Sequence, residues 1–163
     1  MATTWTVRPM RIAESKYDAS PLRNEQYIVA SSASYAIGEP LMRSASNANA
    51  VITWVAASSA TVLGVSRVAS GSAGSAAYFE ELDEGNILEA NCMVSSSAAF
   101  AQTHIGAYGE LDWNASSSAW VVNLVNASSA NHVRVVGLAG MSLIGDFTPR
   151  VEFELVAARI AAP

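Results

Sequence analysis

The chain has 163 residues and a formal net charge of −5; hydrophobic residues make up 51% of it and charged residues only 14%. This length suits one domain, or one domain with an arm, since domains commonly hold roughly 100–200 residues. The negative charge excludes nucleic acid as the main partner, because a duplex binder needs a basic surface that neutralises phosphates. The low charge content instead favours a protein that packs against neighbours.

The first 24 residues have neither the period of a strand nor that of a helix, and Pro9 and Pro21 interrupt them. We interpret residues 1–24 as an extended arm that docks on a partner. A disordered terminus is the alternative, and a helical turn within residues 11–20 also fits. The expected contact residues are four apolar anchors and four basic residues: Trp5, Met10, Ile12 and Tyr17, with Arg8, Arg11, Lys16 and Arg23.

Residues 25–163 are expected to form one all-β domain, a β-sandwich or β-barrel. Nine or ten short apolar or alternating runs recur about every 8–12 residues, separated by clusters of Ser, Asn and Gly, which is typical of such folds. The clearest run is the last, where Val151, Phe153 and Leu155 alternate with two glutamates. The expected strands lie within residues 26–31, 40–44, 49–58, 61–70, 76–82, 87–95, 107–114, 118–126, 132–140 and 150–160.

Residues that carry chemistry are few. Cys92 is the only cysteine, so no internal disulfide forms, and a small buried hydrophobe is the preferred interpretation. His104 and His132 with one cysteine are too few for a zinc site. The acids within residues 80–84 lack the spacing of a calcium loop and are interpreted as a solvated turn. We therefore expect no catalytic residue, no metal and no cofactor, and we do not expect an enzyme.

The aromatic residues on or beside the expected strands are interpreted as core, because large aromatics fill sandwich interiors. A sugar-binding platform is the alternative. Two of the tryptophans flank a Ser-rich turn, and a pair facing each other across a hairpin is an alternative to the core interpretation for these two. The set comprises Trp54, Tyr78, Phe79, Tyr108, Trp113 and Trp120.

Several segments, in order, resemble the small all-β decoration, or cement, proteins of tailed bacteriophage capsids. These segments are "YAIGEPLMRS", "ATVLGVSRVASGSAGSAA", "QTHIGAYGELDW" and "RVVGLAGMSLIGDFTPRVEFELV". The last resembles the common ending of that family: a strand with a Gly, a Gly-Asp-x-x-x-Arg turn, and a final alternating strand. The resemblance covers residues 25–156.

The resemblance implies a protein that binds the outer face of a phage head and stabilises contacts between subunits of the major capsid protein. It also implies self-association, with a homotrimer expected and a dimer as the alternative. The expected location is the outer face of the virion, after synthesis in a host cytoplasm, with no nucleic-acid or membrane partner. Another virion β-module, such as a tail-fibre, spike or carbohydrate-binding domain, is the alternative function.

Overall fold

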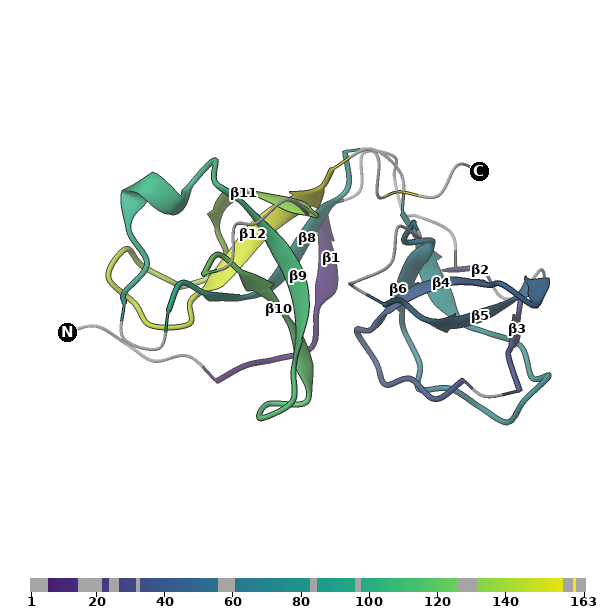
Figure 1. The fold of residues 1–163 in the computed structure, drawn as a ribbon. Coiled ribbons are helices and arrows are strands. Elements are labelled where there is room, and N and C mark those ends of the chain that lie inside the picture. Colours follow the sequence, from purple (N-terminus) through teal and green to yellow (C-terminus); the bar gives the residue numbers. More distant parts are fainter. Residues whose placement is uncertain are drawn as a thin grey trace. The chain divides into compact units, whose positions relative to one another are not determined.

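A computed structural model describes residues 6–14, 22–23, 27–31, 33–55, 61–82, 85–95, 98–125, 132–156 and 160. Within this part, the regular structure consists of strands and one 3-10 turn, Gln102–His104 (Figure 1). The all-β prediction is therefore confirmed. None of the helical structure within these residues is long and apolar enough to cross a membrane.

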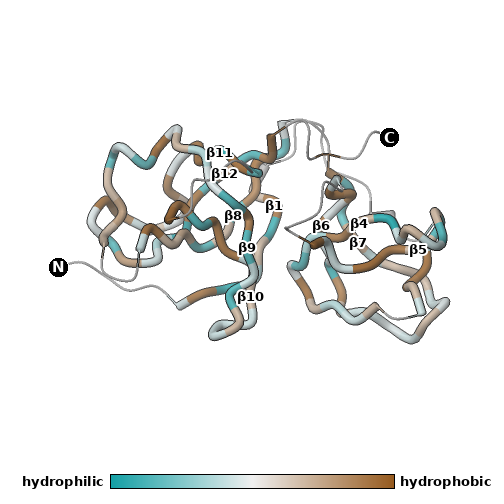
Figure 2. The backbone as a smooth tube through the Cα atoms, in the orientation of Figure 1, coloured by the Kyte–Doolittle hydropathy of each residue, from teal (hydrophilic) through white to brown (hydrophobic). Residues whose placement is uncertain are grey.

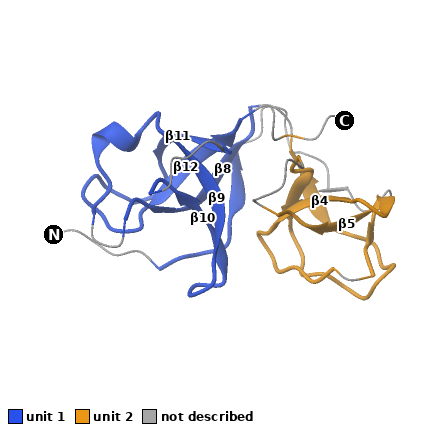
Figure 3. Ribbon diagram, viewed as in Figure 1, with its two compact units in different colours: residues 1–14, 85–156 blue, residues 15–84, 157–163 orange. Residues whose placement is uncertain are grey.

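The chain divides into two compact units, which are coloured separately in Figure 3. Unit 1 comprises Met1–Glu14 and Gly85–Val156, and unit 2 comprises Ser15–Glu84 and Ala157–Pro163. This differs from the single β-domain after residue 24 that the sequence analysis expects. The physical reason is that the strands pair into two separate sheets rather than one continuous set.

Unit 1 is a curled six-stranded sheet in which the strand order closes on itself. The order is β1-β8-β10-β9-β11-β12, and β12 also pairs with β8, so that five of the strands form a ring. Closure leaves few unpaired strand edges, as in a small barrel. The strands are β1 (Arg11–Glu14), β8 (Ile87–Met93), β9 (Tyr108–Asn114), β10 (Ala119–Asn123), β11 (Val133–Leu138) and β12 (Arg150–Leu155).

Strand β8 is the centre of this arrangement. On one side it pairs with β12 in antiparallel register, with Phe153 opposite Leu88. Its other partners are β1, which pairs with residues 87–89, and β10, which runs parallel to residues 91–93. Residues 11–14 of the expected arm are thus a strand of unit 1. Arg11 on this strand pairs with Glu89 on β8, which lies 78 positions further along the chain.

The core of unit 1 follows the predicted alternation. Val151, Phe153 and Leu155 on β12 are buried, whereas Glu152 and Glu154 between them are only partly so. The alternative considered for the two tryptophans, a pair across a hairpin, is found: Trp113 and Trp120 are register partners on β9 and β10, with ring centroids 6.0 Å apart in an edge-to-face arrangement. Hydrophobic residues recur along the strands of both units (Figure 2).

Unit 2 is a second six-stranded sheet, in the order β2-β7-β6-β4-β5-β3. Its core contains Tyr27, Leu41 and Phe79, and the Tyr27 and Phe79 rings pack edge-to-face with centroids 5.5 Å apart. Ile160 joins the unit through a bridge to Val62. The strands are β2 (Leu22–Arg23), β3 (Ile28–Val29), β4 (Pro40–Ser44), β5 (Asn47–Thr53), β6 (Gly64–Ser66) and β7 (Phe79–Glu81).

All ten expected strand positions hold a strand, although several strands are shorter than the apolar runs that predict them. Pro40 begins β4, as expected for a proline at a strand edge. Two strands were not expected, β1 and β2, and both lie within the segment interpreted as an arm.

Candidate functional site

The outer face of β8 carries two polar residues, Glu89 and Asn91, in an otherwise apolar strand. Both are buried, with exposed fractions of 7% and 1%. Asn91 is occupied by main-chain groups: its Oδ1 accepts a hydrogen bond from the Arg8 amide at 3.0 Å, and its Nδ2 donates to Thr148 O at 2.9 Å and Thr6 O at 3.5 Å. Residues 6–8 are therefore fastened onto β8.

The Glu89 carboxylate lies between two guanidinium groups. Arg11 donates through Nε to Oε2 at 2.9 Å and through Nη2 to Oε1 at 3.1 Å, and Arg150 donates through Nε to Oε2 at 2.9 Å. Burial on its own raises the pKa of Glu89, but the hydrogen bonds and charges of the two arginines lower that pKa overall. Glu89 is thus a carboxylate held in its ionised form.

Arg150 is the more enclosed of the two arginines, with 14% of its side chain exposed against 63% for Arg11. Its Nη2 donates to Pro9 O at 2.9 Å and to Glu89 O at 3.3 Å. Its Nη1 is buried and has no hydrogen-bond partner in the described part of the chain. One buried carboxylate shared by two guanidinium groups leaves one positive charge unbalanced.

A pocket of about 540 Å³ opens beside this cluster. The described residues that line it belong to unit 1: Thr6, Arg8, Pro9, Arg11, Glu89, Asn91, Ala139, Gly140, Met141, Ser142 and Arg150. Its described lining contains three arginines and one glutamate, which is a formal charge of +2. Unit 1 as a whole has four arginines and seven acidic residues, a formal charge of −3. The pocket therefore concentrates most of the unit's positive charge.

The loop between β11 and β12 forms one wall of the pocket and presents three large apolar side chains to solvent. Met141 is 80% exposed, Leu143 66% and Ile144 47%. The main chain of this loop is firmly held: the Leu143 amide donates to the buried Asp146 carboxylate at 2.8 Å, and the Gly145 amide donates to Phe100 O at 2.8 Å. We call residues 140–145 the apolar loop.

Further hydrogen bonds hold the base of the apolar loop. The Phe100 amide donates to Asp146 O at 2.9 Å, and the Arg150 amide donates to the Ser142 hydroxyl at 2.9 Å. Gly140 and Gly145 adopt positive φ angles of 62° and 97°, which glycine tolerates and other residues rarely adopt. The exposure of the apolar side chains is thus a consequence of a fixed main chain.

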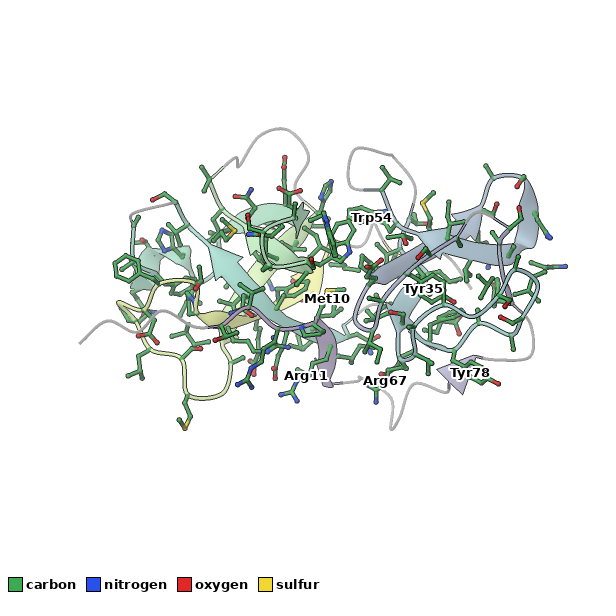
Figure 4. The ribbon with its side chains drawn as sticks, turned by 90° about the horizontal axis from the view of Figure 1, so that it is seen from below. Met10, Arg11, Tyr35, Trp54, Arg67 and Tyr78 are labelled. Carbon is green, nitrogen blue, oxygen red and sulfur yellow. The ribbon has the colours of Figure 1, made fainter. Side chains whose placement is uncertain are left out.

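The expected contact residues differ in how exposed they are and in what they contact. Met10 is 2% exposed and therefore presents no surface to a partner, which corrects its assignment as a docking anchor. Ile12 is half-buried on β1, and Arg11 is exposed but paired with Glu89. Met10 and Arg11 are labelled in Figure 4, where their side chains point in different directions.

Arg8 is exposed, and its guanidinium makes no hydrogen bond to any described residue. Arg23 lies in β2, and its side chain is outside the described part. Trp5, Lys16 and Tyr17 also lie outside the described residues. The structure thus brings Arg8 and Arg11 together at the pocket, and the contact role of all four basic residues stays a prediction.

The cysteine and the two histidines that were considered for chemistry are buried or hydrogen-bonded to the main chain. Cys92 is fully buried, as expected, and burial raises the pKa of its thiol to about 12. His104 Nδ1 accepts a hydrogen bond from the Ala101 amide at 2.8 Å, and the buried His132 accepts through Nδ1 from the Leu111 amide at 3.3 Å. Over the residues that the structure describes, no three His, Cys, Asp or Glu side chains gather in a way that would hold a metal ion.

The aromatic residues divide into two sets. Trp54, Phe79 and Trp120 are buried, which confirms their interpretation as core. That interpretation is wrong for the other three, which are 40–48% exposed: Tyr78, Tyr108 and Trp113. In unit 2, Figure 4 places Tyr78 and Arg67 at the same edge; the Tyr78 carbonyl accepts a hydrogen bond from the Arg67 amide at 3.1 Å, and Arg67 pairs with Glu80 at 3.4 Å.

The sequence interpretation missed the residues that build the pocket around Arg8 and Arg11. Glu89 and Asn91 interrupt "ILEANCMVS" at alternate positions, which is a signal for a polar outer face. Likewise, three large apolar residues between the two glycines of "GMSLIG" are a signal for an exposed contact loop.

Comparison of the chain with protein-family models, with curated proteins and with solved structures found no match.

Proposed function

We propose that this protein is a capsid decoration, or cement, protein that binds the outer face of a phage head and stabilises contacts between subunits of the major capsid protein. The observation that carries the proposal is the apolar loop, in which Met141, Leu143 and Ile144 stand in solvent on a fixed main chain. A rigid apolar protrusion loses little conformational entropy on binding and gains the full burial of its side chains. Such a feature suits attachment to another protein surface.

The sequence resemblance supports the identity proposed for that surface. The segment "RVVGLAGMSLIGDFTPRVEFELV", which resembles the common ending of the decoration proteins, contains the whole apolar loop and the strands on either side of it. The proposed location is the outer face of the virion, and the proposed partner is the major capsid protein.

The proposed mechanism is mechanical. Packaged genome pushes the capsid subunits apart, and a protein that spans the joint between them adds contact that must be broken before the joint opens. Apolar area buried at such a joint contributes roughly 25 cal/mol per Å² before ordering costs are subtracted. Decorated particles should therefore retain their DNA to higher temperatures than bare ones.

The proposed oligomeric state is a homotrimer at local three-fold positions of the shell, with a dimer as the alternative. Closed symmetric assemblies are the general rule for proteins that self-associate, and the low charge content of this chain favours packing against copies of itself. A particle reconstruction that counts copies of this chain per capsid subunit would decide between the two. Attachment as a monomer would contradict both.

The attachment test is binding to undecorated shells by co-sedimentation. We expect Leu143→Ser to weaken binding, because it removes exposed apolar surface while leaving the main-chain bond to Asp146 intact. The matched control is Val125→Ser, which removes a 52% exposed apolar side chain elsewhere in unit 1. Equal binding of both variants and the parent chain would contradict attachment through the apolar loop.

The role of the N-terminal arm needs a finer test than deletion. Removing residues 1–24 also removes β1 and the cover of Asn91, so loss of binding would report misfolding of unit 1. The variant Trp5→Ala changes one side chain of the arm and leaves β1 in place. Trp5 itself lies outside the described residues. We expect this variant to weaken shell binding more than Arg8→Ala does, since an exposed ion pair contributes only about 0–1 kcal/mol.

A carbohydrate-binding virion module is the second candidate, favoured by the exposed aromatics Tyr108 and Trp113 on β9. Aromatic faces of this kind can stack on sugar rings. A glycan array and a shell-binding assay separate the two candidates. Saturable glycan binding without shell binding would replace the cement proposal with this one.

A further inference from the structure

We propose that the basic pocket of unit 1 is a docking site for a carboxylate side chain of a partner polypeptide, with the apolar loop contacting the residues beside that carboxylate. The inference names the chemistry of the partner at the proposed attachment surface. It rests on the proposed function only for the statement that the partner is a capsid subunit.

The first argument is charge balance. Glu89 neutralises one of the two guanidinium groups that hold it, and Arg8 adds a further positive charge at the mouth of the same pocket. Among the residues that the structure describes, no other acidic residue lines the pocket. A carboxylate entering from outside would balance the excess, and charge-assisted hydrogen bonds to guanidinium groups are among the stronger polar contacts in proteins.

The second argument is the supply of free donors. The guanidinium of Arg8 is exposed and makes no hydrogen bond to any described residue. Arg11 uses Nε and Nη2 on Glu89, no described residue accepts a hydrogen bond from its Nη1, and 63% of its side chain is exposed. Both groups therefore meet a ligand before Arg150, whose Nη1 is shielded from water.

The third argument is pre-organisation. Glu89 fixes the Arg11 guanidinium through two hydrogen bonds, and Asn91 fixes the main chain of Arg8. A guanidinium that is already oriented loses less freedom when it binds a carboxylate. The buried Glu89 thus acts as an orienting group for Arg11, and the ligand carboxylate would bind on the side that Glu89 leaves open.

The neighbouring apolar loop decides the class of ligand. Met141 lines the pocket and is 80% exposed, so a ligand in the pocket also meets an apolar side chain. An acidic residue flanked by apolar residues in a polypeptide satisfies both surfaces. A nucleic acid does not, because the formal charge of unit 1 is −3 and would repel an extended polyanion.

The test uses the full chain and three probes: the peptide acetyl-Leu-Glu-Leu-amide, its Gln counterpart, and inorganic phosphate. Binding is followed by nuclear magnetic resonance shifts of the arginine Nε–H signals and of the amides of residues 140–145. We expect the Glu peptide to shift both sets of signals in a saturable way. The Gln peptide should bind at least about tenfold more weakly, since it lacks the charge.

Two variants locate the site. Arg8→Gln should weaken Glu-peptide binding by up to about fivefold, the range of an exposed ion pair. It keeps the Arg8 amide that bonds to Asn91, so unit 1 should remain folded. The matched control, Arg134→Gln, removes one positive charge from an exposed cross-strand pair with Glu154 elsewhere in unit 1 and should leave binding unchanged.

Three results would overturn the inference: equal binding of the Glu and Gln peptides, equal weakening by Arg8→Gln and Arg134→Gln, or binding of phosphate as tight as that of the Glu peptide. The last would assign the pocket to a free anion. Shell binding separates this inference from the proposed function. If the parent chain binds shells and Arg8→Gln binds equally well, the carboxylate site is wrong and the cement role stands; if the parent chain binds no shell, the cement role is wrong.

Discussion

The substitution Glu89→Gln tests whether unit 1 depends on the buried carboxylate. Glutamine has nearly the same volume as glutamate, but it lacks the negative charge that faces Arg11 and Arg150. Its amide NH2 group would also stand opposite an N–H donor of one of these two guanidinium groups. The carboxylate accepts three side-chain hydrogen bonds, and the Glu89 side chain is 9% exposed. Breaking one partner of a buried ion pair commonly destabilises a protein by about 3–5 kcal/mol.

The two arginines place Glu89→Gln at the lower end of this range. Arg11 is 63% exposed and can turn its charge toward water once the carboxylate is gone. Arg150 is only 14% exposed and is also bonded to Pro9 O, so its charge stays enclosed. We therefore expect the free energy of unfolding of unit 1 to fall by about 3 kcal/mol.

Amide hydrogen exchange followed by mass spectrometry is the suitable assay, because it reports on each unit separately. A loss of about 3 kcal/mol should raise the exchange rates of the most protected β8 and β12 amides roughly 150-fold. Peptides from β4 and β5 serve as an internal reference, since both strands belong to unit 2.

The matched control is Glu154→Gln, which breaks a 2.7 Å pair with Arg134 in which both side chains are partly exposed. Exposed pairs contribute about 0–1 kcal/mol, so exchange should rise by less than about fivefold. If Glu89→Gln and Glu154→Gln raise exchange to the same extent, burial of the carboxylate has no energetic consequence and the reasoning is wrong.

Three further predictions concern pH, packing and the thiol. Because the pKa of Glu89 is lowered by folding, its stabilisation is complete above the unfolded carboxyl value of about 4.3 and is lost as the pH falls through the lowered pKa. The difference in unfolding free energy between the parent chain and Glu89→Gln, measured by urea titration, should therefore stay constant from about pH 7 to 5 and shrink below about pH 4; a constant difference down to pH 3 would contradict this. Gly109→Ala should lower the unfolding free energy by about 1–3 kcal/mol, because its Cβ would lie 2.8 Å from the Asn123 carbonyl oxygen, whereas Gly137→Ala, with 3.6 Å to its nearest neighbour, should change it by less than about 0.5 kcal/mol. The thiol of Cys92 should react with Ellman's reagent at pH 8 only after unfolding in urea, because burial raises its pKa to about 12, and stoichiometric labelling of the native chain within seconds would show that the thiol is accessible.

Local patterning predicts the strands of this protein well. In β12 the strict alternation of apolar and acidic residues fixes which face is buried, and the structure agrees at each position from Val151 to Leu155. Pro40 and the Trp113–Trp120 hairpin are equally local, because a fixed φ angle and a short turn determine them. Properties of this kind depend on neighbours a few residues away.

The missed features depend on distant partners. Strand β1 is four residues long without a clear period, and its partner β8 begins at residue 87. No composition shift marks the change from unit 2 to unit 1, so the division into two units is also invisible to local patterning. The pocket needs Arg8, Arg11 and Arg150 at one place, and only the pairing of β8 with β1 and β12 brings them there.

The order in which the strands pair has a consequence for synthesis on the ribosome. Strand β1 leaves the ribosome before β8, and the two strands are separated by residues 15–84, which belong to unit 2. Unit 2 can therefore assemble most of its sheet while β1 still has no partner, although the bridge from Ile160 to Val62 must wait until Ile160 has been made. Slowing or stalling translation before β8 emerges should thus leave a nascent chain in which unit 2 is largely ordered and β1 is sensitive to proteases.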